Sequence, residues 1–186
     1  MSEFPRYALV TIALLAFSLL AGVAVTMTNP EAGQQILDML KEALLSGVID
    51  STPAELAVML FINNLQACTL MFLGGATLGL LTVFIIMTNG VVIGSVMEFV
   101  RQQQGGLYVA AALVPHGIFE IPAFIVSGTL GLLLARALWI EVNGNGDAAA
   151  EALGLGRTFL FVVIPLVAVA AVTEAFITPE IINLVA

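Results

Sequence analysis

Residues 7–28 read YALVTIALLAFSLLAGVAVTMT, a stretch without a single charged side chain. A helix needs roughly 20 predominantly apolar residues to cross the hydrocarbon core of a bilayer, so this stretch can form a transmembrane helix. It is also too long for the apolar part of a signal peptide, which runs about 7–15 residues. We therefore expect an uncleaved membrane helix near the start of the chain.

The composition of the whole chain agrees with this segment. Of its 186 residues, 60% are apolar and 10% are charged, whereas soluble domains carry about 25% charged residues. Only five residues are basic and the net charge is −8, which argues against a nucleic-acid partner. The single cysteine, Cys68, cannot form an internal disulfide. The sequence predicts one all-α membrane domain over residues 1–186, a polytopic transmembrane helical bundle that contacts lipids and holds no cofactor.

Further helices are predicted along the rest of the chain. Asn29-Pro30 and Thr52-Pro53-Ala54-Glu55 are helix-start signals, whereas Asn89-Gly90 is a turn signal. A polar linker is expected over Glu141–Arg157. The predicted segments are an amphipathic interfacial helix over 30–46 that ends at Gly47, a helix and second transmembrane span over 53–88, a short interfacial or re-entrant helix over 90–101, a membrane segment over 107–136, and a last span over 158–178.

The segment over 107–136 contains an unusual interruption. Residues 115–122 read PHGIFEIP, which places Pro115, Gly117 and Pro122 inside an apolar helix. Prolines remove backbone hydrogen bonds, and a membrane tolerates the freed groups only where protein or a wet cavity satisfies them. We therefore predict a broken or re-entrant helix here, with a break or sharp kink between the two prolines.

His116 and Glu120 lie within this interruption and share one face if the backbone stays helical, because they are four residues apart. Ionisable groups at membrane depth are costly and usually face a partner or a cavity. Three uses fit the pair. It could cap backbone groups freed by Pro122, form a site for a proton or another ligand, or supply two ligands to a metal ion. No metal site is assigned, because zinc wants three or four ligands.

Other polar residues interrupt the apolar segments. Asn63 and Asn64, beside Gln66, either join helices by hydrogen bonds or line a polar cavity with His116. Glu174, near the end of the last span, either faces interfacial water or joins Glu120 and His116 in a shared cavity. The sequence thus predicts an intramembrane polar site whose membership depends on how the helices pack.

Small residues at four-residue spacing predict close helix packing, either within the subunit or between two copies of the chain. These pairs are Gly75 with Gly79 and Gly90 with Gly94. No residue is assigned as catalytic, because the chain lacks a nucleophile elbow, a His-Glu-x-x-His motif and a phosphate loop.

The Pro-His-Gly-Ile-Phe-Glu-Ile-Pro-Ala stretch, residues 115–123, resembles the stage II sporulation protein M family of membrane proteins. Asn63-Asn64, Gly74-Gly75, Gly79, Asn89-Gly90 and Gly94 fit the same pattern, so the resemblance covers roughly Asn63–Arg136, about 40% of the chain. It implies an all-helical protein with about five membrane segments. It also maps the polar positions of the family onto His116, Glu120, Asn63, Asn64 and Asn89.

Three functions follow as hypotheses. The resemblance implies a non-catalytic scaffold, expected to be a homodimer, that anchors unknown membrane or envelope proteins. A transporter or channel-like protein would instead use the His116/Glu120 site, since broken helices and buried acids mark substrate sites in transporters. A metal-dependent membrane hydrolase is the third. Basic residues favour a multi-pass cell-membrane protein with a cytoplasmic N-terminus, which places Arg6 and Arg101 on the same side and leaves the number of crossings open.

Overall fold

The computed structural model describes residues 3–45 and 52–185, with side chains over 3–39 and 52–185. Every regular element in these ranges is a helix, which confirms the all-α prediction. Within them, five helices or helical rods are long and apolar enough to cross a membrane. They are α1 (Phe4–Thr28), α3 (Pro53–Leu73) with the 3-10 turn η1 (Gly74–Thr77), α4 (Leu80–Gln104), α5 (Gly106–Val142), and a rod from α6 to α8.

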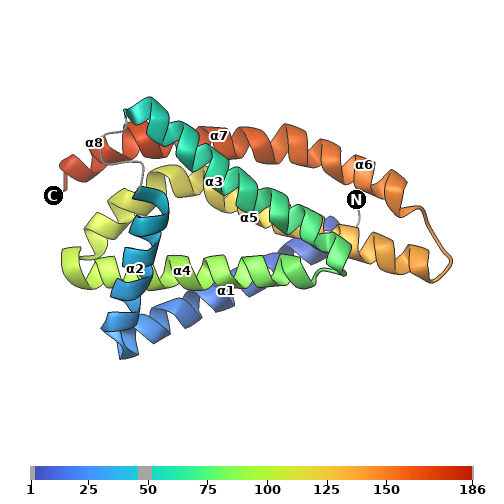
Figure 1. Ribbon diagram of the computed structural model, residues 1–186, viewed down its shortest axis with the longest axis horizontal. Coiled ribbons are helices and arrows are strands. Elements are labelled where there is room, and N and C mark those ends of the chain that lie inside the picture. Colours follow the sequence, from blue (N-terminus) through green and yellow to red (C-terminus); the bar gives the residue numbers. More distant parts are fainter. Residues whose placement is uncertain (1–2, 46–51, 186) are drawn as a thin grey trace.

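The last rod consists of consecutive helical pieces. It runs through α6 (Ala148–Thr158), the π-helical turn η2 (Phe159–Val163), α7 (Ile164–Val172), the π-helical turn η3 (Thr173–Ile177) and α8 (Thr178–Asn183). The remaining helix, α2 (Pro30–Leu45), packs across α4 and α1 (Figure 1). The final residue of the predicted range 30–46 and its predicted end at Gly47 lie outside the described residues.

The bundle has two distinct ends (Figure 1). The start of α1, the turn between α3 and α4, and the loop between α5 and α6 lie at one end, which we call the N-terminal end. Helix α2, the turn between α4 and α5, and the C-terminus lie at the other, which we call the α2 end. All five long elements therefore run from one end to the other.

The α3–α4 turn corrects the predicted span over 53–88 and the short helix over 90–101. The chain reverses at Leu78 and Gly79, whose φ angles of 54° and 86° are left-handed. Thr82 Oγ1 then donates a hydrogen bond of 2.8 Å to the Met71 carbonyl, which joins the two helices. Asn89-Gly90 is not a turn but lies inside the continuous helix α4. The Asn-Gly pair was misleading because both residues also fit inside a helix. The true reversal lacks a comparable signal, because a leucine precedes Gly79.

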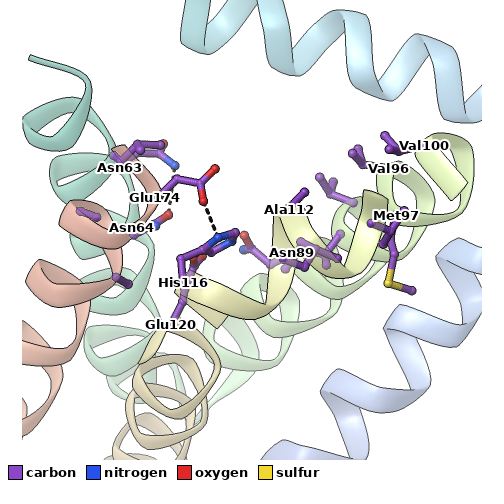
Figure 2. Close-up of a pocket in the computed structure, with 17 residues that line it drawn as sticks. Asn63, Asn64, Asn89, Val96, Met97, Val100, Ala112, His116, Glu120 and Glu174 are labelled. Atoms are coloured by element: carbon purple, nitrogen blue, oxygen red, sulfur yellow. Dashed lines mark hydrogen bonds and ion pairs between the residues drawn. The ribbon is translucent and has the colours of Figure 1, made fainter. Parts of the chain in front are cut away.

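Helix α5 corrects the prediction of a broken or re-entrant segment. It is one continuous helix of 37 residues with Pro115 and Pro122 inside it. It changes direction between the two prolines, so it bends rather than breaks (Figures 1 and 2). A proline removes one hydrogen bond from the helical ladder, which weakens that turn without ending the helix. Gly117 lies within the helix and contributes no break.

The predicted packing glycines all contact other helices of the same chain. A Cβ atom on Gly94 would overlap the Leu19 carbonyl oxygen of α1, and one on Gly90 would overlap the Ser18 hydroxyl. A Cβ on Gly75 would overlap the Gly131 carbonyl oxygen of α5, and Gly79 faces Ala135. The glycines thus allow α1 to pack on α4, and α5 on η1, at backbone distance.

The loop between α5 and α6 is much shorter than the predicted polar linker over Glu141–Arg157. Only residues 143–147 separate the helices, because Asp147 caps α6 by accepting a hydrogen bond of 2.9 Å from the Ala150 amide.

The reversal between α3 and α4, which was not predicted, also changes which basic residues lie at the same end of the bundle. Arg6 lies at the N-terminal end, whereas Arg101 lies at the α2 end, contrary to the prediction that they share a side.

Candidate functional site: a polar cavity between the membrane helices

A cavity of about 310 Å³ lies between α3, α4, α5 and the last rod. Six polar side chains from these four elements face it, among otherwise apolar lining residues (Figure 2). They are Asn63, Asn64, Asn89, His116, Glu120 and Glu174. The structure therefore brings together all the residues for which the sequence predicted an intramembrane polar site.

His116 is the centre of this group. Its Nδ1 atom contacts Oε2 of Glu174, and its Nε2 atom lies 3.8 Å from Oε2 of Glu120. The imidazole side chain is 14% exposed, whereas the side chains of Glu120 and Glu174 are 23% and 34% exposed. One imidazole thus lies between two carboxylates that remain partly open to the cavity.

The bend of α5 positions two of these three groups. His116 and Glu120 lie one helical turn apart, between Pro115 and Pro122, where the helix changes direction (Figure 2). Side chains four residues apart share a helical face, and the bend turns this face toward the last rod.

The third group is positioned by a second helical irregularity. Glu174 lies in the π-helical turn η3, where Thr178 Oγ1 donates a hydrogen bond of 3.3 Å to the Thr173 carbonyl. Single π-helical turns inside α-helices occur frequently at functional sites, because the extra residue redirects a side chain. The cavity also contacts Ala170 and Ala171, two small residues of α7. The rod thus brings a carboxylate to the bent part of α5.

Carboxamides complete the polar end of the cavity. Asn63 Nδ2 donates a hydrogen bond of 3.4 Å to Asn64 Oδ1, on α3. On α4, the Asn89 side-chain amide group donates a hydrogen bond of 2.9 Å to the Ile85 carbonyl. The side-chain oxygen of Asn89 takes no part in that bond. Gln66 lines a different shallow hollow, with Ile62 and Leu70. The polar cluster predicted on α3 is therefore divided between two faces of this helix.

The polar groups lie within helices that are long and apolar enough to cross a membrane. His116 is ten residues from Gly106, the first residue of α5, or about 15 Å along a helix. No lysine or arginine is among the described residues that line the cavity. Its titratable lining groups are two acids and one imidazole.

The arrangement does not form a metal centre. In the described ranges, no three His, Cys, Asp or Glu side chains lie close enough to share a metal ion. The two carboxylates contact opposite nitrogen atoms of one imidazole ring, so they do not converge on a common point beside it. His116 and Glu120 are therefore better suited to hydrogen bonding and charge pairing than to metal ligation.

Sequence reasoning from the residues missed the apolar wall of the cavity. On α4 the lining residues follow helical spacing from Asn89 to Val100, and on α5 from Val109 to Glu120. This periodicity was visible in the sequence, but lipid-facing positions show the same residue types. The lining residues outside the polar group include Val92, Ile93, Val96, Met97, Val100, Val109, Ala112 and Leu113.

Comparison with known proteins bears on the whole bundle. The sequence model described as Stage II sporulation protein M matches residues 10–179, which include all six polar residues. The chain is also 30% identical over 123 residues to the uncharacterized protein MJ0793 of Methanocaldococcus jannaschii, covering 64% of this chain and 68% of that protein. No solved structure matches the chain. The family match spans nearly every described helix and confirms the resemblance drawn from residues 115–123: this integral membrane protein belongs to the stage II sporulation protein M family.

Proposed function

We propose that this protein binds a small cation in its polar cavity and passes it between the two sides of the membrane, as a transporter does. The observation that carries this proposal is the convergence of two carboxylates, one imidazole and three carboxamides on one cavity. Ionisable groups in the bilayer cost roughly 2.5–3.5 kcal/mol each on insertion scales, and they mark ion pathways when they face a cavity. A purely structural ion pair needs neither the third charged group nor the cavity.

The sign of the charge favours a cation. When both carboxyl groups are ionised they carry two negative charges, of which one protonated imidazole offsets one. No lysine or arginine among the described lining residues balances the remainder. At membrane depth the surrounding apolar atoms screen charge poorly, so the remaining negative charge attracts a cation strongly.

Binding of a probe cation tests this proposal. The full chain would be purified into lipid nanodiscs, and equilibrium binding of isotopically labelled methylammonium would be measured. We expect saturable binding, and we expect Glu174→Gln and Glu120→Gln each to weaken it by at least tenfold, because each removes a charge but keeps the side-chain shape. In proteoliposomes, the wild type should take up methylammonium down its gradient faster than either variant.

A matched control separates the cavity from general charge effects. Glu151→Gln makes the same change at an exposed position of α6 that does not line the cavity, and it should bind methylammonium like the wild type. The proposal is wrong if the wild type shows no saturable binding, or if Glu151→Gln weakens binding as much as Glu174→Gln does.

A membrane scaffold is the second candidate function, expected to be a homodimer that anchors other envelope proteins. Family membership supports it, because the resemblance implies an anchoring role. The hairpin formed by the end of α5 and by α6 also supports it, since it projects beyond the α3–α4 turn and exposes Trp139 and Leu153 (Figure 1). A scaffold of this kind should keep its native complex in Glu174→Gln and lose it in Trp139→Ala, as measured by native electrophoresis of solubilised membranes.

A further inference from the structure

We infer that the ligand of this cavity is a primary alkylammonium ion, whose charged head lies at His116 and whose short apolar chain extends toward the α2 end. This inference rests on the proposed cation binding and adds the chemical class of the ligand. It follows from how polar and apolar groups are distributed along the cavity, from its size, and from a second hollow that shares a lining residue with it.

The polar groups lie at one end of the cavity. Figure 2 shows Glu174, His116 and the asparagines grouped together, whereas Val96, Met97 and Val100 lie at the opposite end, with Ala112 between them. A hydrated inorganic cation would leave the aliphatic end without a polar partner. A ligand with one charged end and one apolar end matches both parts of the lining.

The polar end suits an ammonium group in particular. Oε2 of Glu120 and Oε2 of Glu174 make the closest approaches to the imidazole, and each carboxylate has a second oxygen, Oε1, that can accept a hydrogen bond. The carboxamide of Asn89 adds an acceptor oxygen nearby. A primary ammonium ion carries three N–H donors, which these three oxygens can accept.

The aliphatic end suits a chain of a few carbon atoms. A cavity of about 310 Å³ lies at the lower end of the range of roughly 300–1,000 Å³ that is typical of small-molecule sites, so it suits a short chain. Val100 lines this cavity and also a second hollow at the α2 end. That hollow is lined by Gln34, Leu37, Phe99, Gln103, Gln104 and Tyr108, so polar side chains lie next to the aliphatic end of the cavity.

The test compares methylammonium, propylammonium and hexylammonium in equilibrium binding to the full chain in nanodiscs. Each methylene that leaves water for the aliphatic wall should tighten binding about two- to fourfold. Neutral 1-hexanol should not compete, because it lacks the charge that the carboxylates require. Equal affinities across the three amines overturn the inference, even if all three bind and Glu174→Gln weakens each of them.

A pair of alanine variants shows whether the cavity wall causes the chain-length effect. Ala112 lines the middle of the cavity, whereas Ala110 lies on the same helix and is exposed at the outer surface. Ala112→Leu should lose the preference for hexylammonium over methylammonium, measured as the ratio of the two affinities, because leucine takes space in the cavity that the longer chain would occupy. Ala110→Leu should keep the full preference.

Four results are therefore distinguishable. Tighter binding with chain length that Ala112→Leu abolishes supports the inference. Methylammonium binding that needs Glu174 but does not change with chain length leaves the proposed function standing and overturns the inference. If affinity still rises with chain length in Ala112→Leu, the rise reports partition of the amines into the lipid, and this result also overturns the inference. Absence of any saturable binding overturns both proposals.

Discussion

At the scale of single residues, the smallest side chains decide how closely the membrane helices approach. Gly94 lies against the Leu19 backbone, and the Ser95 hydroxyl donates a hydrogen bond of 3.2 Å to the Gly22 carbonyl. Apolar burial does not drive helix association in lipid, because lipid tails are as apolar as the side chains. Close packing and interhelical hydrogen bonds must therefore hold α1 to α4, and both depend on the absence of a Cβ atom at these glycines.

Gly94→Ala should for this reason destabilise the protein. The added methyl group would overlap the Leu19 carbonyl oxygen, which is backbone and cannot rotate away. Overpacking of this kind costs about 1–3 kcal/mol, measured as a lower free energy of unfolding in detergent micelles. Gly154→Ala is the control, because nothing lies within 4 Å of a Cβ at that position of α6. It should raise stability by about 0.5–1 kcal/mol, since alanine is the better helix former. Equal effects of the two substitutions would contradict this account.

At the scale of secondary structure, two irregular helices bring the charged groups together. Helix α5 bends between Pro115 and Pro122, and the last rod widens into the π-helical turn η3 at Glu174. If both helices were regular, the directions in which His116 and Glu174 project would depend only on how α5 and α7 cross. The irregular turns redirect both side chains into one cavity, at the cost of weaker backbone hydrogen bonding in α5.

Replacing the proline should straighten α5. Pro122→Ala restores the amide that can donate to the Ile118 carbonyl, so the bend should relax. Spin labels at Leu107→Cys and Trp139→Cys, both exposed positions, would then move apart. Electron spin resonance would measure this distance in a Cys68→Ser background, which removes the single native cysteine. Methylammonium binding should weaken in parallel, because His116 moves relative to Glu174.

Another proline serves as the control for this measurement. Pro53 occupies the first turn of α3, where its missing amide costs the helix no hydrogen bond. Pro53→Ala should leave the distance between the labels unchanged. An unchanged distance in Pro122→Ala would show that tertiary packing, and not the proline, causes the bend.

At the scale of the whole molecule, the number of crossings sets which basic residues share a side of the membrane. The five long elements place Arg6 at the N-terminal end, together with Arg136 and Arg157. Arg136 follows Ala135, which faces Gly79, and Arg157 lines a hollow with Phe72 and Leu73 at the end of α3. Basic residues are enriched on cytoplasmic sides, so we propose that the N-terminal end is cytoplasmic.

Accessibility of single cysteines tests this topology. In the Cys68→Ser background, Gln104→Cys at the α2 end should react with a membrane-impermeant maleimide in intact cells, and Asn145→Cys should react only after the membrane is permeabilised. Both positions are exposed in the structure. Labelling of both positions from one side would contradict the five crossings. Labelling of Asn145→Cys alone in intact cells would reverse the proposed orientation but keep the crossings.

Local properties of the sequence determined much of this protein. Hydropathy and length predicted an all-α membrane protein, and the four-residue spacing of His116 and Glu120 predicted their shared face. These predictions depend on neighbours along one helix, which periodicity reports directly. Sequence reasoning also identified Glu174 as a possible partner, but it left an interfacial position open. It mistook Asn89-Gly90 for a turn and did not identify the reversal at Leu78-Gly79.

Only the tertiary structure decided which helical faces meet around the cavity, and therefore whether Asn89, His116 and Glu174 lie together. In water, the polar face of a helix can be told from its buried face by composition. In a bilayer, the faces toward lipid and toward neighbouring helices are both apolar, so hydropathy cannot separate them. Packing at Gly90, Gly94 and Gly131 sets the rotation and crossing of the helices, and that rotation brings three distant parts of the chain to one imidazole.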